Sequence, residues 1–295
     1  FEACGVVSRF PHHSPLYKTL LSKDWMAQLC LMQGMRVPVS TKIPRSLIVA
    51  DPLQAAQQAL ETMRHLHNAR ETLQPNDKFT SLPENDDKIV GIAKCGYSWE
   101  AMDVCKFIGQ HKLAEQLTYL VEQRYSLVPH VIVQEYIKHD IEFRLFYTNI
   151  GRTWDLKSKS FRKRKADKIL YTKFEAVDEN GKMREFVRMD RQECMMRMFN
   201  GDAAALKDAE DKAYDLAARI FLWLSCDCSE PPPVMRLDFM VRHAGAGVAD
   251  VYTGEITELG ASFLGWDEAP EIVFGAMLQS CFSNKCQVEA CRCGG

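Results

Sequence analysis

The stretch from residue 234 to residue 266 places acidic side chains inside apolar strands. Asp238 interrupts the apolar run RLDFM, and Glu255 ends a second apolar run after the glycine-containing turn at 244–247. We expect two or three short strands here. A carboxylate with apolar neighbours is costly unless a cation meets it. Two such carboxylates on adjacent strands would suit a hard cation such as Mg²⁺, shared with substrate phosphates. The alternative interpretation is the solvated face of an antiparallel hairpin.

Two basic side chains occupy comparable positions. Arg144 interrupts the run EFRLF, so it needs an anionic partner, and its planar fork suits a carboxylate or a phosphate. Lys94 ends the run KIVGIAK and precedes a turn that contains Gly96 and Ser98. A strand, a Gly/Ser turn and a helix in that order bring backbone amides to a phosphate. The alternative for Lys94 is a lysine that buries its aliphatic stem at a strand end and keeps its ammonium in water.

The most basic segment of the chain is residues 157–168, with the sequence KSKSFRKRKADK. Charge runs of this kind are usually solvated loops. The functional alternative is a mobile loop that meets phosphates or an acidic substrate. A nucleic-acid surface is disfavoured, because the run is short and the net charge of the chain is −2.

Bulk composition limits the class of protein. The chain has 295 residues, which suggests about two domains, and its 46% hydrophobic and 26% charged residues are typical of a globular protein. No apolar run approaches the roughly 20 residues of a membrane-spanning helix. The N-terminal residues lack the apolar core of a signal peptide. We therefore expect a cytoplasmic protein with neither a membrane nor a nucleic acid as its partner.

Cysteine is abundant, with 11 residues. Cys30, Cys95, Cys105 and Cys194 lie inside apolar patterns, as buried free thiols do, which favours a reducing compartment. Four further cysteines gather between residues 281 and 293. A zinc site is the alternative for that cluster, although it lacks the paired, closely spaced ligands of a zinc ribbon.

Periodicity and turn residues predict the elements around these side chains. Helices are expected where apolar residues recur every three or four positions, at 16–35, 51–70, 99–123, 202–224 and 269–282. The second of these begins on an Asp-Pro pair, which suits an N-cap followed by a first helical residue. Strands are expected at 46–50, 88–94, 130–137 and 140–148, and a hairpin at 174–189 turning at 179–181.

The order of these parts resembles the ATP-grasp superfamily from Lys23 to about Gln279. The family's opening Asp-Lys-like pair and its Gly-x-x-x-Pro turn are matched by Lys23-Asp24 and by residues 34–38. Its lysine strand, its Gln-Glu-Tyr-Ile hinge and its Asp-Ile-x-x-Arg-x-Phe strand are matched by residues 88–94, 134–137 and 140–146. Its Arg-x-Asp-Phe…Glu-x-Asn ending is matched by Arg236, Asp238, Phe239, Glu255 and Thr257. The chain departs from this pattern in three places. The opening pair is reversed, Cys95 replaces a proline, and Thr257 replaces the second metal-site asparagine.

The resemblance implies an α+β fold in which two α+β lobes grip a nucleotide. The expected divisions are a helical and αβ segment at 1–87, a small nucleotide-gripping lobe at 88–138, a large metal- and acceptor-binding lobe at 139–283 and a Cys-rich tail at 284–295. A full N-terminal Rossmann-like lobe has no room before Lys23, as in family members without that lobe, which include cell-division-cycle assembly chaperones.

The resemblance also implies ATP and Mg²⁺ as cofactors and a role for each motif. The nucleotide would be held by Lys94, Gly96, Ser98, Gln134, Glu135, Tyr136, Ile137 and Glu142. Within that set the backbone of 135–137 would contact adenine, and Glu142 or Asp140 the ribose. Asp238, Glu255 and Thr257 would hold the metal. The transferring phosphoryl group and its acceptor would be stabilised by Arg144, Arg236, Lys157 and Lys159.

Three functions stay open at this point. The first is a ligase that phosphorylates a small-molecule or peptide carboxylate and passes the acyl phosphate to an amine. The second is a kinase for an anionic small molecule, for which the basic segment 157–168 is the best indication. The third is a non-catalytic nucleotide-binding assembly factor, suggested by the missing front lobe and the Cys-rich tail.

Overall fold

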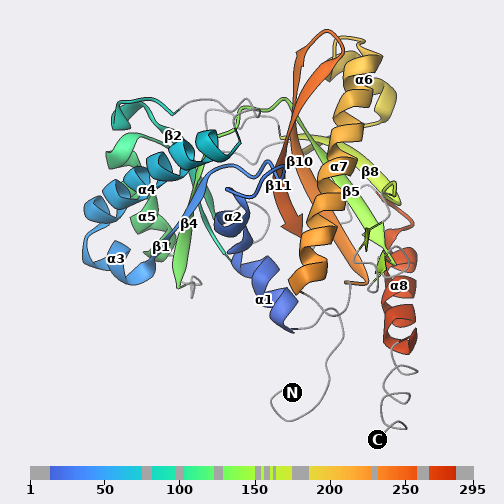
Figure 1. Ribbon diagram of the computed structural model, residues 1–295, viewed down its shortest axis with the longest axis horizontal. Helices are drawn as coiled ribbons and strands as arrows, with labels where there is room; N and C mark the ends of the chain where they lie inside the picture. Colours follow the sequence, from blue (N-terminus) through green and yellow to red (C-terminus); the bar gives the residue numbers. More distant parts are fainter. Residues whose placement is uncertain are drawn as a thin grey trace, which may run out of the picture. The chain divides into compact units, whose positions relative to one another are not determined.

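The structure is a computed structural model, and it divides into two compact units, Lys18–Lys138 and His139–Gly295 with residues 1–17. It describes residues 14–74, 82–96, 103–122, 129–149, 154–155, 160–161, 164–174, 186–227, 232–257 and 266–283. Each unit combines helices with an antiparallel sheet (Figure 1), so the predicted α+β class is confirmed.

The unit Lys18–Lys138 is built on a four-stranded sheet. Its order is β1-β4-β2-β3 and every pairing is antiparallel. The strands are β1 Ser40–Pro44, β2 Val90–Cys95, β3 Val104–Ile108 and β4 His130–Glu135. The helices are α2 Trp25–Leu29, α3 Arg45–Ala50, α4 Pro52–Leu73, α5 Gly109–Glu122 and the short 3-10 turn η2 Asp86–Lys88, while α1 Ser14–Ser22 crosses the division between the units. Because β1 pairs with β4, residues on both sides of position 88 share this sheet.

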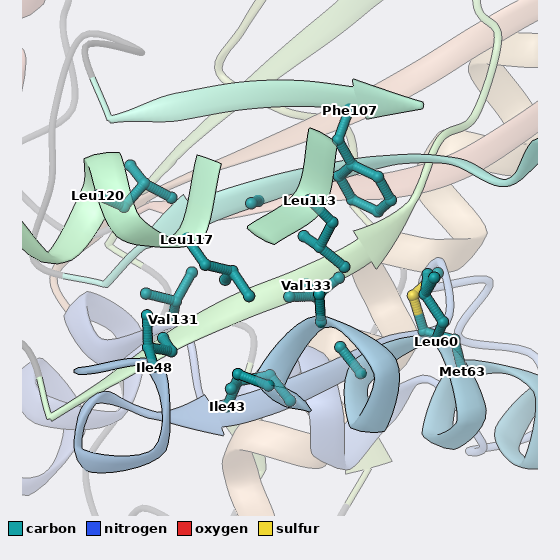
Figure 2. Close-up of a cluster of buried hydrophobic side chains, with 14 of the residues drawn as sticks. Ile43, Ile48, Leu60, Met63, Phe107, Leu113, Leu117, Leu120, Val131 and Val133 are labelled. Atoms are coloured by element: carbon teal, nitrogen blue, oxygen red, sulfur yellow. The ribbon is translucent and has the colours of Figure 1, made fainter. Parts of the chain in front are cut away.

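One face of this sheet packs on α4 and α5 (Figure 2). Alternation along each strand sends Ala93, Val131 and Val133 into that core, and it sends Lys94 and Gln134 to the opposite face. Phe107 reaches across from β3, and its ring covers Gly91, where a Cβ would lie only 2.2 Å from the ring. The core therefore fixes which strand residues remain for chemistry.

Helix α4 begins as its sequence predicts. The Asp51 side chain accepts a hydrogen bond from the Gln54 amide at 2.9 Å, and Pro52 occupies the first helical position. The helix runs on to Leu73, slightly beyond the expected end at residue 70.

Three element predictions in this unit were wrong. Residues 46–50 form most of helix α3 and not a strand, because β1 already fills the place beside β4 and α3 buries Ile48 in the core. The expected helix at 16–35 is broken at Lys23, whose φ is +59°, into α1 and α2. The expected helix at 99–123 begins only at Gly109, because Val104–Ile108 pairs with β2 as an edge strand.

The second unit is built on a five-stranded antiparallel sheet with the order β11-β10-β5-β8-β9. Its strands are β5 Ile141–Thr148, β8 Lys168–Phe174, β9 Phe186–Met189, β10 Val234–Gly245 and β11 Val248–Thr257. A separate two-stranded pair is formed by β6 Trp154–Asp155 and β7 Ser160–Phe161, and the helices are α6 Arg191–Met198, α7 Ala203–Asp227 and α8 Ala269–Ser283. The stretch from 234 to 257 is thus two long strands, of 12 and 10 residues.

The two faces of this sheet have different coverings. Helix α7 packs on one face, where the ring of Tyr147 meets Phe221 edge-on at 4.9 Å. On the other face, Trp266 and helix α8 pack on Phe146, Leu170 and Val234. The polar residues of the candidate site lie on this same face as Phe146 and Val234, because side chains two positions apart on a strand share a face.

The expected free thiols are confirmed where the structure describes them. Cys30, Cys95 and Cys194 are free and buried, whereas Cys105 is half-buried and free. The cysteines at 286–293 lie outside the described residues.

Candidate functional site

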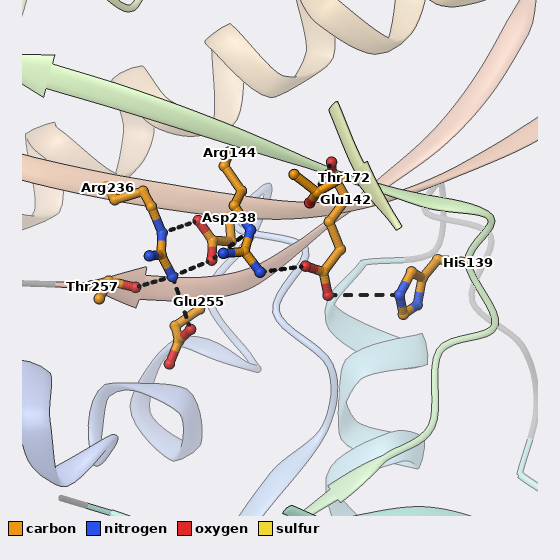
Figure 3. Close-up of polar contacts among 8 residues, drawn as sticks. All are labelled: His139, Glu142, Arg144, Thr172, Arg236, Asp238, Glu255 and Thr257. Carbon is orange, nitrogen blue, oxygen red and sulfur yellow. Dashed lines mark hydrogen bonds and ion pairs between the residues drawn. The ribbon is translucent and has the colours of Figure 1, made fainter. Parts of the chain in front are cut away.

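Six charged or hydroxyl side chains from three neighbouring strands gather on one face of the five-stranded sheet (Figure 3). Asp238 lies opposite Arg144 on β5 and opposite Glu255 on β11, so it stands at the centre of the group. The intervening residues of β10 are apolar and point to the α7 face. The group consists of Glu142, Arg144, Arg236, Asp238, Glu255 and Thr257.

A β-bulge brings the β11 side chains to this face. Asp238 pairs with Glu255 but the next residue, Phe239, pairs with Thr253, so Gly254 is an extra residue in β11. A bulge shifts the alternation by one position. Without it, a continuous alternation from the buried Thr253 would turn Glu255 and Thr257 toward α7. A Cβ on Gly254 would lie 3.1 Å from the carbonyl oxygen of Asp238, so the close approach favours glycine.

Arg236 forms a two-pronged ion pair with Asp238. Its Nε donates to Oδ1 at 2.7 Å and its Nη2 donates to Oδ2 at 2.7 Å. The same Nη2 lies 3.3 Å from Oγ1 of Thr257 and 3.5 Å from Oε2 of Glu255. The Arg236 and Asp238 side chains are only 6% and 7% exposed, so each charge is compensated by its partner rather than by water.

Arg144 connects this pair to Glu142. Its Nε lies 3.9 Å from Asp238 Oδ2, and its Nη2 donates to Glu142 Oε2 at 3.3 Å. The other oxygen of Glu142 lies 3.8 Å from Nε2 of His139, and Thr172 donates its hydroxyl to the Glu142 backbone oxygen at 3.3 Å. His139 and Thr172 were missed in the sequence. The register of β8 against β5 brings Thr172 opposite Glu142, whereas His139 lies three residues before Glu142.

Burial affects the protonation of both charge types. It raises the pKa of the Glu142 carboxyl, an effect that Arg144 opposes and Asp238 reinforces. Burial by itself would lower the pKa of the Arg236 guanidinium, but the Asp238 carboxylate outweighs it and the pKa is raised. Arg236 therefore stays a cation in this setting.

The second set of predicted residues lies in the unit Lys18–Lys138. Lys94 donates from Nζ to Gln134 Oε1 at 2.9 Å, and Gln134 donates from Nε2 to Ser40 Oγ at 2.8 Å. This chain crosses three adjacent strands on the face opposite the core. Gly96 is the first residue after β2, and a Cβ there would lie 2.5 Å from the Ser22 carbonyl oxygen. Lys94 is half-buried and has a protein partner, so it is held in a defined place.

Glu135 has a structural role that the sequence did not reveal. Its carboxylate accepts from Arg70 at 2.6 and 3.0 Å and from the Val39 amide at 2.9 Å, and Arg70 is fully buried. The amides of Glu135 and Tyr136 donate to the carbonyl oxygens of Val39 and Val90. The side chain of the predicted hinge glutamate is therefore used to join β4, α4 and the residues before β1.

Part of the basic segment is also structural. Arg164 donates to Asp167 at 2.6 Å and to the Thr148 carbonyl at 2.9 Å, while Asp167 accepts from the Thr148 amide. The charge of Arg164 is thus compensated at the end of β5. Lys157 and Lys159 lie outside the described residues, as does Ser98.

Within the described ranges no group of three or more His, Cys, Asp or Glu side chains could hold a metal ion. The candidate ligands of the five-stranded sheet are two carboxylates and a hydroxyl. In the same ranges, no helix is both long and apolar enough to cross a membrane.

The chain is similar to solved structures of ATP-grasp ligases, the superfamily expected from the motif order. One is D-cycloserine synthetase DcsG, at 16% identity and a TM-score of 0.48 over 90% of this chain and 71% of that one. Another is D-alanyl-alanine synthetase A from Vibrio cholerae, at 10% and 0.49 over 92% and 66%. A third is the ATP-grasp ligase PsnB complexed with a minimal precursor, at 11% and 0.45 over 95% and 65%.

The chain spans about two thirds of the length of these structures. No protein-family model and no curated protein sequence matches it.

Proposed function

We propose that the protein is an ATP-dependent ligase of the ATP-grasp type, which phosphorylates a carboxylate for attack by an amine. The observation that carries this proposal is the single polar face on which Asp238, Glu255 and Thr257 meet Arg144 and Arg236 (Figure 3). Oxygen ligands beside guanidinium groups are the side chains that phosphoryl transfer requires, since its main demand is positioning and charge stabilisation.

The oxygen set fits a magnesium ion bound together with phosphates. Mg²⁺ in such sites usually takes one or two carboxylates from the protein and completes its shell with phosphate oxygens and water. Asp238 and Glu255 supply two carboxylates from paired strands, and Thr257 adds a hydroxyl. Their oxygens already surround one cationic atom, Nη2 of Arg236. When bound, the ion would neutralise charge on the terminal phosphates.

The remaining residues are given roles that match their chemistry. Arg144 and Arg236 are always charged and would bind the transferring phosphoryl group and its acceptor through planar forks. Lys94, held by Gln134, would contact phosphate. The backbone of 135–137 would contact adenine through groups other than the amides of Glu135 and Tyr136, because those two amides donate to carbonyl oxygens within the protein. Glu142 would contact ribose.

A carboxylate acceptor is favoured over the kinase alternative. The kinase hypothesis depended on a concentrated positive charge at residues 157–168. The ion pair between Arg164 and Asp167 removes part of that charge from the side chains available to an anion.

Hydroxylamine trapping tests the reaction class directly. The protein is incubated with ATP, Mg²⁺ and a pool of small carboxylates and amino acids, with or without hydroxylamine. An acyl phosphate would be captured as a hydroxamate with release of ADP and phosphate. Asp238→Asn serves as the control that should lose this activity.

Each alternative gives its own result in the same assay. A kinase would produce ADP and a stable phosphorylated product, with neither hydroxamate nor free phosphate. An assembly factor would bind ATP without turnover. Either of these outcomes contradicts the ligase proposal.

A further inference from the structure

Nη2 of Arg236 occupies the point toward which three oxygen side chains converge (Figure 3). It lies 2.7 Å from Asp238 Oδ2, 3.3 Å from Thr257 Oγ1 and 3.5 Å from Glu255 Oε2. These are the three side chains proposed above as metal ligands. The guanidinium therefore holds the position that a cation bound by the same oxygens would need.

We propose that Arg236 is an internal counter-ion that competes with a divalent cation for this oxygen set, so that cation binding releases the guanidinium from Asp238. The proposal rests on the function proposed above and describes how the same site is regulated. A magnesium ion sits about 2.0–2.1 Å from its oxygen ligands. An ion at that distance from Oδ2 would lie within a few ångströms of Nη2, where two positive charges repel in a poorly hydrated setting.

The charges of the site support an exchange rather than simple addition. Asp238 is nearly buried, so its carboxylate needs a cation at all times, and Arg236 supplies it in the absence of metal. Arg144 lies 3.9 Å from Asp238 and bridges to Glu142 through contacts that do not involve Arg236. The Glu255 side chain is 37% exposed, so an incoming ion can bind this solvent-facing carboxylate first.

Release would also give Arg236 its second role. While both of its donors are bound to Asp238, the fork is not free to face a phosphate. An ion that takes over Asp238 would free the guanidinium to bind the anion that arrives with the metal. Metal binding and phosphate binding are then coupled through one side chain.

A matched ion pair on the same two strands provides the control. Arg242 on β10 lies opposite Asp250 on β11 and donates to its carboxylate. Like the contact of Arg236 with Glu255, it joins β10 to β11, whereas Asp238 lies on β10 two residues from Arg236. Asp140 and Tyr252 interact with Arg242 electrostatically, but the contacts described for Arg242 include a hydrogen bond only to Asp250, so its removal should create no cation site.

The test is a titration of the nucleotide-free protein with Mn²⁺, followed by calorimetry or by the electron paramagnetic resonance of free Mn²⁺. Arg236→Met should bind Mn²⁺ at least about tenfold more tightly than the wild type, the gain expected if the paired state holds nine-tenths of the molecules or more. Arg242→Met should match the wild type. Equal or weaker binding by Arg236→Met overturns the proposal.

Two further measurements keep the test sharp. Added Mn²⁺ should raise the melting temperature of Arg236→Met more than that of the wild type, because a ligand that binds the folded state more tightly stabilises it more, by RT ln(1 + [L]/Kd). If Arg236→Met does not fold, Arg236→Lys replaces it. It keeps a charge near Asp238 but lacks the fork, so a smaller gain in Mn²⁺ affinity is expected, and no gain overturns the proposal.

Failure of this inference can be told apart from failure of the proposed function. If the wild type binds Mn²⁺ together with ATP and loses this on Asp238→Asn, the metal site stands. An absent gain in the Arg236 variants then rejects only the exchange. If the wild type does not bind Mn²⁺ with ATP at all, the proposed function is rejected, and the exchange with it.

Discussion

Asp238 has two duties, as the counter-ion of a buried arginine and as a proposed metal ligand. Asp238→Asn should abolish Mg²⁺-dependent ATP binding, because a neutral amide no longer attracts the ion. It should also destabilise the protein by about 3 kcal/mol, since it leaves the Arg236 charge buried without its main partner. Calorimetric titration of Mg²⁺ with ATP and urea unfolding measure the two effects. An unchanged Mg²⁺ titration would contradict the assignment.

Lys94 lies in the unit Lys18–Lys138, and its proposed contact with phosphate can be tested through ATP binding alone. Lys94→Ala should weaken ATP binding by about 1–3 kcal/mol, the range for losing a hydrogen bond to a charged partner. Lys94→Arg should also be defective, because a planar fork does not replace a compact ammonium that already bonds Gln134. Wild-type affinity in both variants would show that Lys94 only ends its strand.

At the scale of the element, the bulge in β11 places Glu255 and Thr257 on the face that holds the candidate site. Gly254→Ala would place a methyl group 3.1 Å from the Asp238 carbonyl oxygen, which must shift by a few tenths of an ångström. We expect weaker Mg²⁺-dependent ATP binding, and a loss in the free energy of unfolding that is smaller than the loss in Asp238→Asn. Gly275→Ala in α8 is the control, because its Cβ meets nothing within 4 Å and alanine should add about 1 kcal/mol to an exposed helix. Equal metal dependence in the two variants would remove the bulge from the argument for function.

At the scale of the whole molecule, each unit has a sheet and a core of its own. The unit Lys18–Lys138 buries residues of α4, α5 and its four strands together. We therefore expect residues 18–138, produced alone, to fold and to unfold in one cooperative transition on heating. Circular dichroism measures this. A chain without a thermal transition would show that this core needs the rest of the molecule.

Local chemistry made much of this protein predictable. The Asp-Pro start of α4, the long helix α7 and the paired strands β10 and β11 follow from capping, periodicity and a glycine turn, which act over a few neighbouring residues. The acids and arginines that interrupt apolar strands likewise marked the candidate site, because such side chains need partners wherever they lie.

Tertiary structure decided which partner each side chain has. The burial of Arg70 against Glu135 depends on the packing of α4 beside β4. The contacts of Arg236 with Thr257 and Glu255 depend on strand register and on one extra residue in β11. Residues 46–50 became a helix because β1 had taken the place beside β4. These outcomes arise from contacts between residues far apart in sequence, and no local preference encodes them.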